Sequence, residues 1–456
     1  MKTVVILAAG EGKRMWPYAV IRPKCMIPIA NKPVIGHMVE TLKSIGFENI
    51  IIAGGKLTEQ IANHFRKMSG VKIVKVDGAK GTAIALKEVS QYIPDDNFLV
   101  LHGDTIIEKH DLEALVESIE KSNVPVALIE PLNDELSNDW ICCAVNEGNI
   151  HNVTGHPRYK CSHRFCGFAL TSEVLGYIEC NSGIFSNVNV GVMPPLEGYL
   201  EMSLADYISD GNIIKAVETK GTFIDMDKPW HILEANRYMV NKLCNDLSSN
   251  ALGENAEIDS SAVIEGYVRL GDGSRIGRNV IIKGSIIVGN NTIIDNGAII
   301  EGNAVIGDNC IVRNYCQIGG GSSIGNRCII EHCAEFSGIT MDRVHLYHYM
   351  ELGGIIGTCT DIGAATVCGG LRFDDGITEH RIRGRREKPK EYANSSYLGD
   401  FSRTGVNAII MPGCKTGVYS IVGPGVLLNE DLPDNTMIMV EQQTVKKHWG
   451  PEKYGW

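Results

Sequence analysis

The chain has 456 residues, of which 44% are hydrophobic and 21% are charged, and its formal net charge is −11 at pH 7. This length exceeds one ordinary hydrophobic core, so two domains are expected. The acidic balance argues against a nucleic-acid or membrane partner, and an anionic ligand would need a local cluster of cations. No run of about 20 apolar residues is present that could span a bilayer.

The spacing of the cysteines indicates in which cellular compartment the protein works. All 14 occur without C-x-x-C spacing or a zinc-ligand pattern. The first residues lead into a short apolar strand, with none of the long apolar core of a signal peptide. We therefore expect free thiols and a cytoplasmic location.

The first predicted element is a buried parallel strand at residues 4–7, which runs into a turn containing Gly10 and Gly12. Glycines in such a turn let backbone N–H groups approach a polyphosphate, because no Cβ blocks the way. Arg14 and Lys24 follow and supply cations. The turn lacks the G-K-[ST] of a Walker A loop and the third glycine of a dinucleotide fingerprint.

Helical spacing predicts a helix at residues 34–45, and a buried strand follows at 49–53. Helices and strands then alternate to residue 101, as in a parallel sheet with crossover helices. Gly81 and Thr82 open one of these helices, whose N-terminal amides would contact a nucleotide base or phosphate. An ordinary helix start is the alternative interpretation.

An aspartate follows one of the apolar strands of this domain. Asp104 comes after the strand at residues 98–101, at the sheet edge where open α/β folds bind ligands. Magnesium prefers one or two carboxylates together with phosphate oxygens, so Asp104 is a candidate metal ligand. A helix N-cap is the alternative role for an aspartate at a strand end.

The pattern L-A-A-G-x-G-x-R-M-x-P, which begins at Leu7, and the later Pro-Lys pair resemble the signature of the sugar-1-phosphate nucleotidyltransferases (nucleotide-sugar pyrophosphorylases). The resemblance implies a Rossmann-like α/β nucleotidyltransferase domain over residues 1–245. It implies that Arg14, Lys24 and Asp104 are catalytic, and that Asp104 and Asp225 hold Mg²⁺. The nucleotide-binding residues that it implies are Leu7, Ala8, Ala9, Gly10, Gly12, Gly81 and Thr82.

This chain departs from the family pattern in several places. Residues 76–79 lack the glutamine that reads uracil in some members, and Asp227 stands where glycine is usual. The glutamate of a sugar-binding glutamate-lysine-proline is absent near residues 150–157. The usual sugar-contacting asparagine is replaced at Cys166 or its neighbour. The base and the sugar therefore stay open, with UTP or dTTP and a hexose 1-phosphate ahead of GTP and mannose 1-phosphate.

The second domain is a repeat. An aliphatic residue recurs every six positions from Leu252 to Ile330, and small residues commonly stand four positions later. Such a period fills the inside of a triangular coil, and it explains the 50 glycines. The pattern resembles the hexapeptide-repeat left-handed parallel β-helix, which we expect over residues 251–431. In that family the flat faces usually close into trimers.

The repeat is interrupted twice. Its phase shifts by two after Glu335, and a basic segment at about 371–397 breaks it and is expected to protrude as a loop. Residues 432–456 are expected to form a C-terminal tail.

Bifunctional nucleotidyltransferase–acetyltransferases, bacterial and archaeal, share this two-domain arrangement, and they acetylate an amino-sugar phosphate with acetyl-CoA. Their histidine base lies in H-x-x-Y, and the nearest candidates here are His345 and His348. The spacing differs, and glycine replaces an expected asparagine. These differences favour a trimerisation or regulatory β-helix over acetyl transfer.

We therefore predict nucleotidyl transfer from a nucleoside triphosphate to a sugar 1-phosphate by a homo-oligomer that uses Mg²⁺. Two alternatives remain, an additional acetyltransferase activity and a non-catalytic scaffold of the same architecture. Scaffold relatives typically have a degraded nucleotide loop, whereas Arg14, Lys24, Asp104 and Asp225 are all present here.

Overall fold

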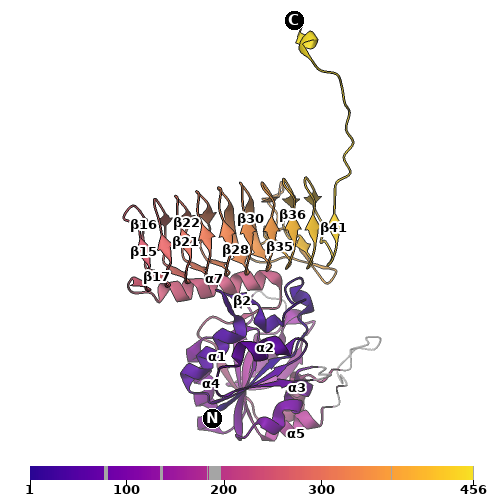
Figure 1. Ribbon diagram of the computed structural model, residues 1–456. Coiled ribbons are helices and arrows are strands. Elements are labelled where there is room, and N and C mark those ends of the chain that lie inside the picture. The colour runs from indigo at the N-terminus through magenta and orange to yellow at the C-terminus, as the bar shows by residue number, and fades with distance from the viewer. Residues whose placement is uncertain (77–80, 134–136, 182, 184–196, 371, 455–456) are drawn as a thin grey trace.

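The computed structural model describes residues 1–76, 81–133, 137–181, 183, 197–370 and 372–454, which form an α/β domain below a β-helix (Figure 1). The residues at 77–79, where the uracil-reading glutamine is missing, lie outside this described part, as does the first residue of the basic segment. Among the described residues, no helix is both long and apolar enough to cross a membrane.

A nine-stranded sheet forms the centre of the first domain. The strands on one side of it are parallel, as predicted, whereas β11 is antiparallel to both of its neighbours and makes the sheet mixed. The strand order is β5 (Val71–Lys75), β4 (Asn49–Gly54), β1 (Thr3–Ala8), β6 (Asn97–His102), β11 (His163–Thr171), β8 (Val126–Pro131), β12 (Lys215–Glu218), β10 (Asn149–Gly155) and β9 (Ile141–Asn146).

Helices cover both faces of this sheet. The predicted helix at 34–45 is confirmed as α1, and Gly46 ends it in the left-handed conformation with φ 105°. One face carries α1 (Val34–Ile45), α2 (Thr58–Phe65), α4 (Lys109–Ser122) and α7 (Pro229–Asn245). The other face carries α3 (Thr82–Val89), α5 (Glu173–Glu179) and α6 (Leu200–Ser209).

Short elements connect this framework. Two small antiparallel pairs are β2 (Pro28–Ile29) with β3 (Lys32–Pro33) and β7 (Thr105–Ile106) with β13 (Ile224–Asp225). The 3-10 helices of this domain are η1 (Lys13–Met15), η2 (Lys24–Met26), η3 (Ser90–Tyr92) and η4 (Ser137–Asp139). A further 3-10 helix, η5 (Pro451–Tyr454), lies near the C-terminus, beyond the β-helix.

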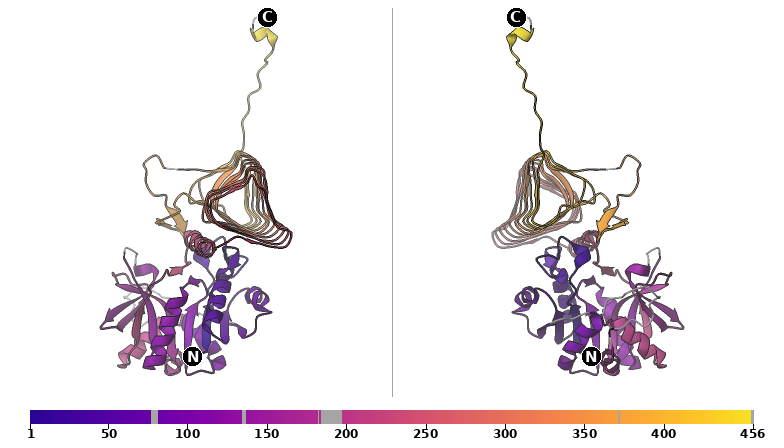
Figure 2. Two further views of the ribbon diagram at one scale, coloured as in Figure 1. Left: turned by 90° about the vertical axis from the view of Figure 1, so that its left-hand side faces the viewer. Right: turned by 90° about the vertical axis from the view of Figure 1, so that its right-hand side faces the viewer.

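The second domain is a left-handed parallel β-helix with a triangular cross-section, as the hexapeptide period predicts (Figure 2). Cys310, Cys316 and Cys328 lie fully buried inside it, in the small-residue positions of the repeat. Its first face comprises β14 (Ala251–Leu252), β17 (Val268–Leu270), β20 (Ile286–Val288), β23 (Ala304–Ile306), β26 (Ser322–Ile324), β35 (Ser396–Leu398) and β38 (Lys415–Thr416).

Two further faces complete the triangle. The second comprises β15 (Glu257–Ile258), β18 (Arg275–Ile276), β21 (Ile293–Ile294), β24 (Ile311–Val312), β27 (Ile329–Ile330), β29 (His345–Leu346), β31 (Asp361–Ile362), β36 (Arg403–Thr404), β39 (Ile421–Val422) and β41 (Met437–Ile438). The third comprises β16 (Val263–Ile264), β19 (Ile281–Ile282), β22 (Ile299–Ile300), β25 (Gln317–Ile318), β32 (Val367–Cys368), β37 (Ile409–Ile410) and β40 (Leu427–Leu428).

The predicted phase shift corresponds to shortened coils. Partners in successive coils are normally 18 residues apart, but they are 16 apart around β28 (Glu335–Thr340) and β30 (Glu351–Ile356). Each of these two strands runs through the corner between the third and first faces. Gly338 and Gly354 stack at this corner with φ 126° and 134°, and a Cβ on Gly338 would lie 2.1 Å from the Gly354 carbonyl oxygen. Glycine is therefore required where the coil is shortened.

One buried cluster spans both domains, in addition to the separate cores of each domain. Helix α7 lies along the β-helix (Figure 1), and Val305, Ile339, Ile355 and Tyr397 belong to the same buried cluster as strand β1. The buried Tyr18 hydroxyl donates to the Ile355 carbonyl at 2.8 Å. The first domain therefore packs on the first face of the β-helix and on its shortened corner.

The C-terminal tail begins later in the chain than expected. Strand β41 pairs with β39, so the last rung of the β-helix lies inside the segment expected as the tail, residues 432–456. Beyond β41 the chain extends away from the β-helix and ends near η5 (Figure 1).

Candidate functional site

The glycine-rich turn lies at the edge of the sheet, where β1 and β6 end side by side. The Gly103 N–H donates to the Leu7 carbonyl at 2.9 Å and joins the two strand ends. Gly12 has φ 65°, and a Cβ there would lie 2.9 Å from the Ala19 Cβ. Gly10 has open space around it, with no atom within 4 Å of a Cβ built on it. Gly12 is thus required by the turn itself, while Gly10 leaves the turn open toward the cavity.

Two aspartates are brought together by the small β7–β13 pair. Asp225 is the register partner of Thr105, which directly follows Asp104. The Met226 N–H donates to the Asp104 carbonyl at 3.1 Å. Residues 121 positions apart in the sequence therefore meet, as the resemblance to the nucleotidyltransferases implies for Asp104 and Asp225.

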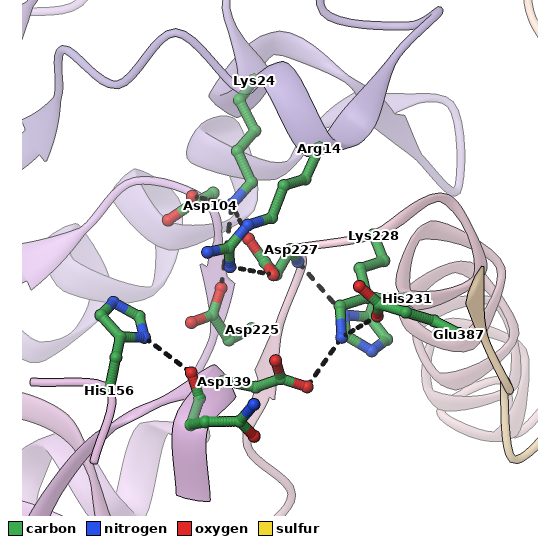
Figure 3. A network of polar contacts seen from close by, with 11 residues as sticks. Arg14, Lys24, Asp104, Asp139, His156, Asp225, Asp227, Lys228, His231 and Glu387 are labelled. Atoms are coloured by element: carbon green, nitrogen blue, oxygen red, sulfur yellow. Dashed lines mark hydrogen bonds and ion pairs between the residues drawn. The ribbon is translucent and has the colours of Figure 1, made fainter. Parts of the chain in front are cut away.

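Lys24 contacts both of these aspartates (Figure 3). Its Nζ lies 2.6 Å from Asp104 Oδ2, 4.0 Å from Asp225 Oδ1 and 4.0 Å from Asp227 Oδ1. Burial alone would lower the pKa of Lys24, but the three carboxylates raise it above its usual value. Lys24 is therefore a fixed positive charge at any physiological pH.

Arg14 is paired with the aspartate that stands in place of a glycine. Its Nη1 lies 2.8 Å from Asp227 Oδ2 (Figure 3). Burial would raise the pKa of Asp227, but Lys24 and Arg14 together hold it below its usual range. The unusual aspartate is the one local signal of this pairing, because Arg14 is 213 residues away in the chain. Asp227 is a site residue that sequence reasoning missed.

Asp225 is electrostatically different from Asp227. Its burial raises the pKa, Lys24 opposes this effect, and the neighbouring carboxylates of Asp104 and Asp227 add to it, so the net shift is upward. Three carboxylates thus lie within 4.0 Å of one ammonium group. A divalent cation fits such a site, since magnesium is held by one or two carboxylates and completed by phosphate and water oxygens. Within the described ranges, no set of three or more His, Cys, Asp or Glu side chains forms a ready-made metal cage.

A second layer of polar contacts fixes this strand end. The Asp227 N–H donates to His231 Nδ1 at 3.2 Å, and burial lowers the pKa of His231 to about 3, so the ring accepts as a neutral base. Lys228 Nζ lies 2.8 Å from Asp139 Oδ2 and 2.6 Å from Glu387 Oε2 (Figure 3). Glu387 belongs to the basic segment of the second domain, so that segment reaches the site.

The remaining nucleotide-loop candidates line the same cavity. A cavity of about 690 Å³ is bordered by Gly10, Lys24, Asp104 and Asp227, and its full lining also includes Leu7, Ala8, Ala9, Gly12, Arg14, Gly81 and Thr82. Asp225 lies 4.0 Å from Lys24, which lines the cavity, but Asp225 itself does not line it. Thr82 Oγ1 accepts a hydrogen bond from the Leu200 N–H at 2.8 Å, so its side chain holds the start of α6.

The region expected to bind the sugar holds an unusual carboxylate. Glu201, in the first turn of α6, is 6% exposed, and its Oε2 has no hydrogen-bond partner among the described residues. Burial raises its pKa to about 7. A Cβ on Gly155 would lie 2.6 Å from Glu201 Oε1, so the glycine makes room for this side chain. Cys166 is buried in the core and does not line the nucleotide cavity.

The two histidines considered for acetyl transfer lie in the β-helix, apart from this cavity. His345 is in β29, and His348 lies at the following corner with φ 54°. His348 Nδ1 lies 2.9 Å from Nδ1 of His332 on the adjacent coil, and their rings are 4.7 Å apart. Neither candidate lines the nucleotide cavity.

Comparisons with protein families match both halves of the chain. Residues 3–138 match the nucleotidyl transferase family. Residues 285–320 and 303–338 match the bacterial transferase hexapeptide family of six repeats.

Full-length relatives span both domains. The bifunctional protein GlmU of Methanococcus maripaludis is 32% identical over 447 residues, which cover 97% of this chain and 98% of the relative. The bifunctional sugar-1-phosphate nucleotidylyltransferase/acetyltransferase of Sulfurisphaera tokodaii is 25% identical, covering 94% of this chain and 97% of the relative. Among solved structures, UDP-glucose pyrophosphorylase complexed with UDP-glucose aligns with 19% identity and a TM-score of 0.46, covering 53% of this chain and 99% of that one.

Proposed function

The chain belongs to the family of bifunctional GlmU proteins, and from that premise we propose how its first domain carries out nucleotidyl transfer. The reaction transfers a nucleotidyl group from a nucleoside triphosphate to a sugar 1-phosphate, giving a nucleotide sugar and pyrophosphate. A phosphate oxygen of the sugar attacks the α-phosphorus and forms a new P–O bond. The bond from the α-phosphorus to the bridging oxygen of the β-phosphate breaks, and pyrophosphate leaves with those electrons.

The observation that carries this proposal is the meeting of Lys24 with Asp104 and Asp225 beside an open glycine turn. Phosphoryl chemistry of this kind depends mainly on positioning and on neutralising charge. The backbone N–H groups of the turn would bind the triphosphate. Lys24 would lie between the incoming and the α-phosphate, and Arg14 would stabilise the departing pyrophosphate.

The acidic pair is suited to a magnesium ion. Asp104 and Asp225 would hold it, since both carboxylates lie within 4.0 Å of Lys24 Nζ and magnesium prefers one or two carboxylates with phosphate oxygens. When bound, Mg²⁺ neutralises phosphate charge and orients phosphate oxygens. Asp227 would keep Arg14 extended toward the cavity through the ion pair between them.

A substrate screen tests this function. Purified protein is given each of four triphosphates with a panel of sugar 1-phosphates, and pyrophosphate is measured. We expect UTP or dTTP with a hexose 1-phosphate to react, ahead of GTP with mannose 1-phosphate. Asp104→Asn should reduce kcat/KM by at least about a hundredfold, because the metal and Lys24 lose a charged partner. The exposed Asp246→Asn at the end of α7 is the matched control.

Acetyl transfer is a second candidate, favoured by the names and full coverage of the relatives. His345 or His348 would act as the general base, and acetyl-CoA would be the donor. Free thiol release from acetyl-CoA with glucosamine 1-phosphate tests it directly. Absence of thiol release, in a preparation that still makes pyrophosphate, would leave the β-helix as an assembly domain. We expect it to assemble a homotrimer, with His345 and His348 at the subunit interface.

A further inference from the structure

The basic segment of the β-helix domain contains a hairpin that lies against the first domain (Figure 2). Its strands are β33 (His380–Ile382) and β34 (Arg385–Glu387), joined by the two-residue turn Arg383–Gly384. Both turn residues have positive φ, 48° and 82°. Turns of this kind strongly prefer asparagine or glycine at the first position, so an arginine there adopts a backbone conformation that costs energy.

Apolar and charged contacts fix this hairpin in place. Ile382 is buried, and the buried His380 ring packs edge-on against Trp230 at a centroid distance of 5.3 Å. At the other strand, Glu387 pairs with Lys228, one residue from Asp227. Trp230 and Lys228, which closely follow Asp227 in the chain, therefore hold the two strands of the hairpin in place.

The tip of the hairpin borders the nucleotide cavity. Arg383 lines the 690 Å³ cavity together with Gly10, Lys24 and Asp104. It also lines an adjoining cavity of about 710 Å³, whose walls are the same glycine turn and the hairpin tip. The tip thus lies beside the glycine turn, and the exposed Arg383 borders the space where the triphosphate would bind.

Charge pairing distinguishes Arg383 from the other cations of this cavity. Lys13 pairs with Glu11, Arg14 with Asp227, and Lys24 with Asp104. Arg383 makes no hydrogen bond or ion pair with another described residue. It contributes only at longer range to the lowered pKa of Glu11, after Lys13 and Lys56.

We propose that the β-helix domain completes the nucleotide site of its own chain, with Arg383 binding the phosphates of the nucleoside triphosphate. The inference rests on the proposed function of the cavity. A triphosphate brings several negative charges, and the cations of the first domain are already largely balanced by carboxylates. A guanidinium with a free fork of donors binds phosphate in a bidentate manner, which lysine does not match.

Steady-state kinetics and equilibrium binding of full-length variants test this role. Arg383→Ala should raise both KM and Kd for the Mg²⁺–triphosphate by about tenfold, with the KM for the sugar 1-phosphate within about twofold of wild type. Arg383→Lys should recover part of the loss, and the salt dependence of triphosphate binding should weaken in Arg383→Ala. The control is Arg386→Ala, an exposed arginine of β34 that lines neither cavity and should bind triphosphate like wild type.

The outcomes separate this inference from the proposed function. Unchanged triphosphate affinity in Arg383→Ala, or an equal loss in Arg386→Ala, overturns the role of Arg383 while pyrophosphate release by the wild type still supports the function. If the wild type releases no pyrophosphate with any substrate pair, the proposed function fails. Isothermal titration with each of the four Mg²⁺–triphosphates alone then still decides whether Arg383 binds phosphate.

Discussion

The two domains distribute their charged side chains in opposite ways. At the sheet edge, Lys24 gathers Asp104, Asp225 and Asp227 within 4.0 Å of one nitrogen atom. In the β-helix, charged residues instead pair one coil apart, as Lys283 does with Glu301 at 2.7 Å. A sheet edge concentrates side chains from distant segments, whereas a solenoid spaces them in rows along its axis. The Arg383 hairpin is an inserted segment that departs from these rows and borders the cavity of the first domain.

The largest effect is expected where the sheet edge concentrates charge. Lys24→Ala should lower kcat/KM by about a thousandfold or more, since several kcal/mol of transition-state stabilisation depend on this ammonium. Initial rates of pyrophosphate release at substrate concentrations below KM measure it. Lys121→Ala is the control, because Lys121 is exposed and pairs with Glu117 on α4, away from the cavity. Near-normal turnover by Lys24→Ala would show that the gathered charges do not serve this reaction.

An intermediate effect is expected in the β-helix, where the close stacking of successive coils is tested in place of the gathered charges. Gly338→Ala should destabilise the fold by roughly 2 kcal/mol or more, because its Cβ would collide with the Gly354 carbonyl at a positive φ. Thermal unfolding followed by circular dichroism measures it. At Gly353 the nearest atom to a new Cβ is 3.9 Å away, so Gly353→Ala should unfold near the wild-type temperature. Equal melting of both variants would contradict the requirement for glycine at the shortened corner.

The smallest effect is expected at Glu201. This carboxyl group is buried without a neighbouring cation among the described residues, whereas the three aspartates of the site surround Lys24. The pKa of Glu201 is about 7 when folded and near 4.5 when unfolded, so the folded state keeps its proton longer. Between these values, rising pH ionises the unfolded chain first and lowers stability, on the order of 1–3 kcal/mol by pH 8.

Glu201→Gln should remove this pH dependence. Its melting temperature should exceed that of the wild type by a few degrees at pH 8, and the difference should shrink toward pH 4.5. Scanning calorimetry across this range measures it. A wild-type advantage at pH 8 would mean that the Glu201 carboxylate has a stabilising partner when ionised.

Much of the fold could be predicted because its signals are local. The helix at Val34–Ile45 followed from periodic apolar residues and a terminal glycine, and the β-helix followed from its six-residue period. Even the shortened coils appeared as a phase shift in the sequence. The grouping of Asp104 with Asp225 was accessible through the family resemblance, which implies that both hold Mg²⁺.

The rest depends on contacts between distant segments. Asp227 pairs with Arg14 from 213 residues away, and no local pattern announces this pairing. The basic segment was recognised as an insertion, but its docking beside the nucleotide cavity depends on Ile382 and Glu387 meeting the first domain. Glu201 was missed for a similar reason, since its significance comes from the glycine opposite it, Gly155.

The core that crosses the domain boundary has a consequence for inactivation by heat. Tyr18 and Arg22, between the two cations of the glycine loop, are anchored to Ile355 and Asp400 of the β-helix. Unfolding of the β-helix would remove these two contacts from the glycine loop, and the cavity that the loop borders would lose its shape. We therefore expect heating to inactivate the first domain no later than it unfolds the β-helix.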